Sequence, residues 1–160
     1  MILNSNKQYS DQAVVTIAVG EAYQKIARLT HPTLKAYAEK IKADFIVIDQ
    51  SNTSTPHWQK FRLYFLLDIY SRIIWIDSDA IVRRDTPNLF ELVPEKQFGI
   101  FNEAPFTPDR KGALVKACED HGLTVREWNG FYANTGVMVI SSCHKYLFRK
   151  PEREIFNFYE

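Results

Sequence analysis

The chain has 160 residues, which suits one domain with a sizeable apolar core and leaves little room for a second. Hydrophobic residues make up 46% and aromatic residues 14% of the sequence, which excludes a disordered chain. The 20 basic and 19 acidic residues nearly balance, and no basic run stands out, so we expect no nucleic-acid partner.

No apolar run reaches the roughly 20 residues that a membrane-spanning helix needs. The first residues, MILNSNKQYSDQ, are polar after the third position and do not resemble a signal peptide. The cysteines, Cys118 and Cys143, lack the close spacing of a metal-binding or redox pair, so we expect two reduced thiols. Together these features predict a soluble, cytoplasmic protein without a membrane span.

In chain order, apolar and β-branched runs predict five strands, at 13–20, 44–49, 72–77, 98–102 and 134–141. Apolar residues at helical spacing predict helices at 21–43, 58–70 and 109–122, a short turn-and-helix at 86–94, and an amphipathic segment at 151–160. Pro32 is expected to kink the first helix, or to open a second one with Thr30 as its cap. Gly122 is expected to close the helix at 109–122.

The alternation of strands and helices has a consequence for the fold. Strands that follow one another through helices are joined by right-handed crossovers and lie parallel in one sheet. We therefore predict a Rossmann-like α/β fold, with a mainly parallel central sheet inside a three-layer α/β/α sandwich. Ligands of such sheets bind beyond the carboxyl ends of the strands.

The stretch RIIWIDSDAIV places two aspartates, Asp77 and Asp79, directly after a predicted buried strand. An unpaired carboxylate is costly to bury, so these residues need partners. A turn at the small Ser78 would let both carboxylates converge on one point. Carboxylates suit Mg²⁺ or Mn²⁺, which complete their shell with water and substrate phosphates. The structural alternative is that Asp77 ends the strand and Asp79 caps the following turn.

The D-x-D motif has companions in the sequence: Lys60 upstream, LFEL downstream, and the later strand NTGVMVIS. With them it resembles the nucleotide-sugar-dependent glycosyltransferases of the A-type (GT-A) fold. Within that group the chain is most similar to the retaining family 8, which includes glycogenin and bacterial lipopolysaccharide galactosyltransferases. The W-x-K of HWQKF also resembles the galactosyl- and mannosyltransferases of the yeast Golgi type. The resemblance covers residues 14–141 and implies retaining transfer of a hexosyl unit from a nucleoside-diphosphate sugar.

The resemblance implies a role for each matching residue. Asp79 would bind Mn²⁺ or Mg²⁺, and Asp77 would share the metal and touch the donor ribose. Lys60 would contact the donor nucleotide, where a cation suits the negative phosphates. The implied donor site also includes Ala18, Val19 and Gly20 around the base and ribose, and Asp49 near the base. Ser78 lies between the aspartates, and Asn134, Thr135 and Gly136 would lie under the sugar. The implied catalytic residues are Asp77, Asp79 and Asn134.

The implied partners are a UDP- or GDP-sugar donor and a glycan or other hydroxyl acceptor. Two features of the family are missing, however: a histidine that supplies a third metal ligand, and a D-Q element, both beyond the NTGV strand. His144 follows that strand, but its spacing does not suggest a metal ligand. We therefore expect residues 1–160 to form one minimal or C-terminally truncated domain, with the donor-binding part present and the acceptor elements absent. Self-association into a homo-oligomer could bury apolar surface left uncovered in such a domain.

Two other functions remain open. A nucleotide-sugar-binding or assembly module would hold the donor without turnover, and donor hydrolysis would distinguish it from an enzyme. A Mg²⁺-dependent phosphatase of the haloacid dehalogenase type also carries D-x-D after a strand. In that class the motif ends the first strand, whereas here it ends the third predicted strand.

Overall fold

A computed structural model describes residues 10–50, 56–120, 122–124 and 127–150 of the chain. The predicted amphipathic segment 151–160 lies outside the described residues. With η denoting a 3₁₀ helix, the elements are β1 (Gln12–Ile17), α1 (Glu21–Lys40), β2 (Asp44–Ile48), η1 (Pro56–Arg62), α2 (Leu63–Leu66), β3 (Arg72–Ile76), α3 (Leu89–Leu92), β4 (Gly99–Asn102), α4 (Arg110–Asp120), β5 (Ala133–Ser141) and η2 (Ser142–Phe148). All five predicted strands are confirmed.

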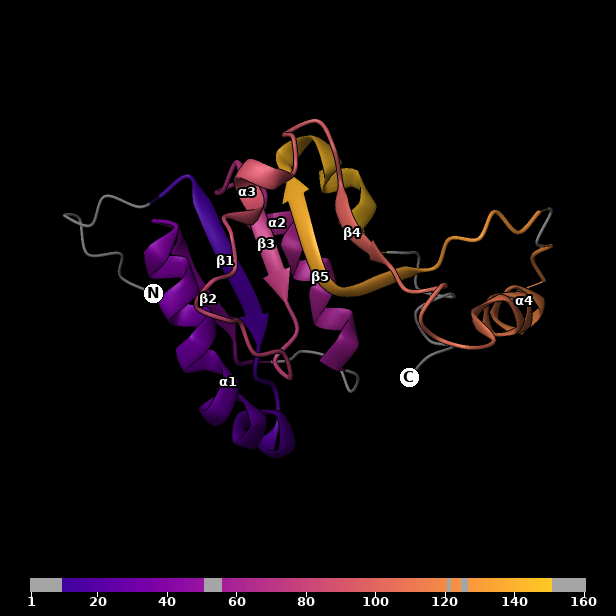
Figure 1. The fold of residues 1–160 in the computed structure, drawn as a ribbon, viewed down its shortest axis with the longest axis horizontal. Coiled ribbons are helices and arrows are strands. Elements are labelled where there is room, and N and C mark those ends of the chain that lie inside the picture. Colours follow the sequence, from indigo (N-terminus) through magenta and orange to yellow (C-terminus); the bar gives the residue numbers. More distant parts are fainter. Residues whose placement is uncertain (1–9, 51–55, 121, 125–126, 151–160) are drawn as a thin grey trace.

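The strands form one sheet in the order β2-β1-β3-β5-β4 (Figure 1). Strand β1 pairs in parallel with β2 and β3, whereas β5 runs antiparallel to both β3 and β4. The fold is therefore mixed α/β. The prediction of a mainly parallel sheet is right for the two pairs of β1 and wrong for the two pairs of β5.

The connection between β4 and β5 explains this difference. A parallel pair needs a crossover helix that packs on the sheet. Helix α4, which lies in this connection, contains no buried residue and stands away from the sheet (Figure 1). The chain therefore does not cross over a face of the sheet but returns beside β4 in the opposite direction.

Apolar side chains on the two faces of the sheet form two clusters. One face packs against α2 and η2, with Leu63 and Phe148 among its buried residues. The other face packs against α1 and α3, with Leu34 and Phe90 among its buried residues. Successive strand residues point to opposite faces, so a strand covered on both sides needs an unbroken apolar run. This is why the sequence of β3, RIIWI, is a continuous apolar run after Arg72 and does not alternate between apolar and polar residues.

Two helix predictions need correction. The predicted helix 58–70 consists of the 3₁₀ helix η1 and the single-turn helix α2, a region rich in aromatic residues, which lose side-chain freedom in an α-helix. Helix α1 continues through Pro32, so Thr30 is not a cap. The Thr30 hydroxyl instead donates a hydrogen bond to the Ser78 carbonyl at 2.5 Å, a tertiary contact that sequence spacing does not reveal.

The described residues give two further facts about the chain as a whole. Both cysteines are free thiols, as predicted. In this part of the chain no helix combines the length and the apolar character needed to cross a membrane.

Candidate functional site

Residues 77–80, which we call the aspartate turn, follow β3 at the carboxyl end of the strand. The Ala80 amide donates to the Asp77 carbonyl at 3.1 Å, so the chain turns at Ser78 as predicted. Ser78 is 2% exposed, and its carbonyl accepts the bond from Thr30 of α1. A buried carbonyl that lacks a partner is costly, so this bond helps to hold the turn against α1.

Asp77 has two strong partners within the described structure. The Trp75 indole Nε1 donates to Asp77 Oδ1 at 2.7 Å, and the Lys60 ammonium lies 3.0 Å from the same oxygen. Lys60 also donates to the carbonyl and hydroxyl oxygens of Thr135, at 3.0 and 3.1 Å. Through these bonds Lys60, whose side chain is only 19% exposed, connects η1 with the aspartate turn and with β5. Charge-assisted bonds of this kind fix the orientation of a carboxylate.

Gly136 allows β5 to approach the aspartate turn closely. The Asp77 amide donates to the Gly136 carbonyl at 2.8 Å. A Cβ atom at position 136 would lie 3.4 Å from Asp77 Oδ2 and 2.9 Å from Asn134 Oδ1. The second distance is shorter than real Cβ contacts, so a larger residue here would displace the Asn134 side chain. Glycine is needed for close approach rather than for an unusual backbone angle.

Asn134 belongs to a second polar group, the Glu103 network, formed by Glu103, Thr107, Arg110 and Asn134. Its amide nitrogen donates to Glu103 Oε2 at 3.1 Å, while its carbonyl oxygen accepts from the Gly136 amide at 2.8 Å. Arg110 and the Thr107 hydroxyl donate to the other oxygen of Glu103. The Arg110 guanidinium, followed by Thr107 and Asn134, lowers the pKa of the Glu103 carboxyl from 4.5 to about 2.

A small hollow of about 80 Å³ lies over the aspartate turn. It is lined by Ile17, Tyr23, Lys60, Trp75, Asp77, Ser78 and Asp79. Both aspartates thus face one space. Asp79 is exposed, so its carboxylate is accessible from that space.

The donor set of this hollow fits a hard divalent cation. Magnesium is commonly held by one or two protein carboxylates and keeps several water ligands, and two carboxylates are present here. Among the described residues, no group of three or more His, Cys, Asp or Glu side chains is arranged to hold a metal. Any further ligands would have to come from water, from a bound anion or from outside the described ranges.

The remaining predicted donor residues lie at the same edge of the sheet but do not line the hollow. Ala18 is buried, and its amide donates to the Ile48 carbonyl at 2.8 Å. Val19 packs against the apolar cluster that contains Trp75. Gly20 is exposed with φ of 82°, in the left-handed region that favours glycine, and Asp49 is exposed just after β2. Because β1, β2 and β3 are parallel, their carboxyl ends share this edge.

Sequence reasoning missed several residues of this site. Trp75 could have been found, because residues two apart in a strand share a face and Trp75 precedes Asp77 by two. Tyr23 and Thr30 lie on α1, and Glu103 follows β4. No local pattern ties these three residues to the aspartates. His144 is buried and its Nδ1 accepts from the Ser141 amide at 3.1 Å, so this nitrogen holds the start of η2.

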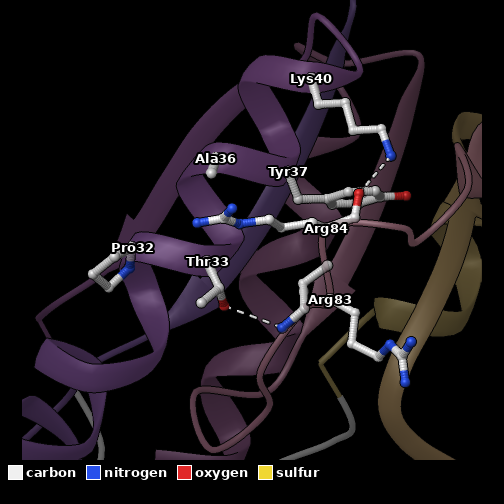
Figure 2. A pocket seen from close by; sticks show the side chains of 8 residues that line it. Pro32, Thr33, Ala36, Tyr37, Lys40, Arg83 and Arg84 are labelled. Atoms are coloured by element: carbon white, nitrogen blue, oxygen red, sulfur yellow. Dashed lines mark hydrogen bonds between the residues drawn. The ribbon is translucent and has the colours of Figure 1, made fainter.

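A larger hollow, of about 480 Å³, lies between α1 and residues 82–84 (Figure 2). Its lining includes no acidic side chain. Lys40 donates to the carbonyls of Arg84 and Thr86, and the Thr33 hydroxyl accepts from the Val82 amide, so these polar groups already have partners (Figure 2). Despite its size, this hollow lacks the clustered reactive groups found over the aspartate turn.

No protein-family model matches the chain, and no curated protein matches its sequence. A solved structure with a similar fold is the crystal structure of a glycosyltransferase involved in the glycosylation of the major capsid of PBCV-1. The two chains are 14% identical and have a TM-score of 0.59 over 86% of this chain. The match spans 63% of that protein's chain. At this identity the likeness shows a shared fold, with a mixed α/β sheet.

Proposed function

We propose that this domain is a metal-dependent glycosyltransferase that moves a hexosyl unit from a nucleoside-diphosphate sugar to an acceptor hydroxyl. The single observation that carries the proposal is the hollow over the aspartate turn, where Asp77, Asp79 and Lys60 meet at the carboxyl edge of the sheet. The fold shared with a solved glycosyltransferase supports it. The proposal includes two finer points: that the fold is a three-layer GT-A sandwich, and that the chain is related to the retaining family 8.

Each charged residue of the hollow has a role in donor binding. Asp77 and Asp79 would hold Mn²⁺ or Mg²⁺, which supplies positive charge against the developing negative charge of the diphosphate leaving group. Lys60 orients Asp77 by its ion pair and adds a second positive charge near the phosphates. Trp75 donates to the same carboxylate oxygen, and the Lys60 ammonium lies 5.4 Å from the centroid of its ring.

The donor nucleotide and sugar extend in opposite directions from the aspartate turn in this proposal. Toward β1 and β2, Ala18, Val19, Gly20 and Asp49 lie at the strand ends and would receive the base and ribose. Toward β5, the sugar would lie over Gly136 and Asn134. Among the described residues, Glu103 engages one amide hydrogen of Asn134, and the second would be available to a hydroxyl of the donor sugar.

A thermal-shift screen tests donor binding directly. UDP-, GDP- and CDP-hexoses are each added with and without Mn²⁺, and we expect at least one to raise the melting temperature only when the metal is present. Asp79→Asn keeps the size of the side chain and removes its charge, so it should abolish that metal-dependent shift. Asp120→Asn, at an exposed aspartate of α4, is the matched control. Absence of a metal-dependent shift with all three donors would refute the proposal.

Release of free sugar then separates an enzyme from a binding module. A glycosyltransferase should slowly hydrolyse its donor in the presence of Mn²⁺, whereas a module would bind the donor and leave it intact. Metal-dependent binding without any release, over hours at saturating donor, would favour the module. Hydrolysis of simple phosphate monoesters, inhibited by vanadate, would instead favour the phosphatase alternative.

A further inference from the structure

Two phenylalanines stack on each other in solvent beside the candidate site. The rings of Phe101 and Phe106 have centroids 5.3 Å apart and an angle of 25° between their planes. Phe101 nevertheless remains 52% exposed and Phe106 72% exposed. Single exposed apolar residues need no explanation. Here, however, two large rings hold each other in place, and the outer face of each ring is left as a flat apolar surface that can bind a partner.

This aromatic pair lies next to Asn134 and Glu103, two residues of the Glu103 network. In the β4–β5 register Phe101 is opposite Asn134, and residues directly opposite in an antiparallel pair point to the same face. The Phe106 amide donates to the Glu103 carbonyl at 3.0 Å, so the second ring is tied to the residue that holds the Asn134 amide. The pair is therefore positioned by the same contacts that position Asn134.

The order of the strands places the aromatic pair beyond the space for the donor sugar. Strand β5 lies between β3, which ends in the aspartate turn, and β4, which carries Phe101. Neighbouring strands are about 4.8 Å apart, so β4 is roughly 10 Å from β3. A ligand ring stacked on the aromatic pair would therefore lie next to a sugar over Asn134 and Gly136, rather than in its place.

A pyranose ring matches this surface chemically. It has an apolar face formed by C–H groups, which stacks on aromatic rings, and a rim of hydroxyls, which needs planar hydrogen-bonding groups nearby. The aromatic pair supplies the first surface, and the Glu103 network beside it supplies the polar groups. We propose that Phe101 and Phe106 form the acceptor platform of the site, and that the acceptor is a carbohydrate bound through one face of a pyranose ring.

The role of this sugar as an acceptor rests on the proposed function. The test therefore measures the binding of the acceptor and of the donor separately. Saturation-transfer difference NMR is recorded with the methyl pyranosides of glucose, galactose and mannose as probes. We expect at least one of them to receive saturation, most strongly at the protons of one ring face. Phe106→Ala should weaken the binding of that probe about three- to tenfold, the range typical for one aromatic stacking contact.

The matched control is Phe65→Ala on α2, which removes a phenylalanine of similar exposure, 68%, from a different element of the fold. This variant should bind the probe as the wild type does. Thermal shifts with UDP-hexose and Mn²⁺, taken on the same samples, should be equal for Phe106→Ala and wild type. If Phe106→Ala loses probe binding but keeps the donor shift, the result supports the acceptor platform. If the wild type shows no metal-dependent donor shift, the proposed function fails instead.

Three results would overturn the inference. The first is that none of the three methyl pyranosides receives saturation from the wild-type protein. The second is that Phe106→Ala and Phe65→Ala bind the probe equally. The third is that the wild type forms a dimer, seen by sedimentation, which Phe106→Ala dissociates, because the aromatic pair would then bind a second copy of the chain instead of a sugar.

Discussion

The aspartate turn and the connection between β4 and β5 lie on either side of β5 and are stabilised in opposite ways. The turn packs on fully buried residues such as Trp75, and its own Ser78 is only 2% exposed. The connection, residues 103–132, carries α4, which has no buried residue. Each region has one carboxylate paired with one cation, Asp77 with Lys60 and Glu103 with Arg110.

The comparison shows that similar ion pairs have different tasks in the two regions. At the aspartate turn, apolar packing already fixes the backbone, so the main effect of the ion pair is to orient the Asp77 carboxylate. In the connection, little apolar burial is available, so the Glu103 network supplies much of what joins the described part of this segment to β5. The first region thus has the rigidity that the proposed donor site needs, whereas the second depends mainly on polar contacts.

The largest expected effect is on stability and comes from the apolar side. Leu63 is completely buried in the cluster that contains Trp75, so Leu63→Ala should lower the free energy of unfolding by about 2–5 kcal/mol. Leu114→Ala, the same change on the half-exposed α4, should cost less than about 1 kcal/mol. Urea unfolding at pH 7 measures both. Equal costs would mean that the connection has its own apolar core, and the contrast would be wrong.

A middle-sized effect is expected at the cation of the aspartate turn. Lys60→Ala removes one charge-assisted partner of Asp77 and of a bound diphosphate, so the affinity for UDP in the presence of Mn²⁺ should fall about 10- to 100-fold. Isothermal titration calorimetry measures this change. Lys116→Ala removes an exposed lysine paired with Asp120 on α4 and should leave the affinity unchanged. If both variants bind equally, Lys60 is only a structural partner of Asp77.

The smallest expected effect is a pH dependence within the connection. Arg110 and its neighbours hold the pKa of Glu103 at about 2 in the folded protein, below its ordinary value of 4.5. A carboxylate whose pKa is depressed by folding stabilises the protein fully above its ordinary pKa, and that contribution is lost as the pH falls toward the folded value. Glu103→Gln should therefore destabilise the protein most above about pH 4.5, and progressively less as the pH falls toward about 2.

Urea unfolding of wild type and Glu103→Gln between pH 2 and 7 measures this dependence. Glu119→Gln, which changes an exposed glutamate of α4, is the control and should show no comparable trend. A difference between wild type and Glu103→Gln that stays constant across this range would show that the charge of Glu103 does not stabilise the connection.

The sequence by itself determined the strands and the place of the aspartates. A strand covered on both faces must be apolar throughout, so runs such as β1 and β3 could be found without tertiary information. Polar residues directly after such a run, as in IDSD, had to lie at the strand end, and a small residue between the aspartates allowed the turn. These are local constraints, and local patterns are sufficient to reveal them.

Only the tertiary structure decided the direction of β5 and the partners of the site residues. Lys60 meets Asp77 across 17 residues, Asn134 meets Glu103 across 31, and Thr30 meets Ser78 across 48. Such pairs depend on which strands become neighbours, and that choice depended on α4 standing off the sheet instead of packing on it as a crossover helix. The same turn residues would have different partners in a sheet whose last strands ran parallel.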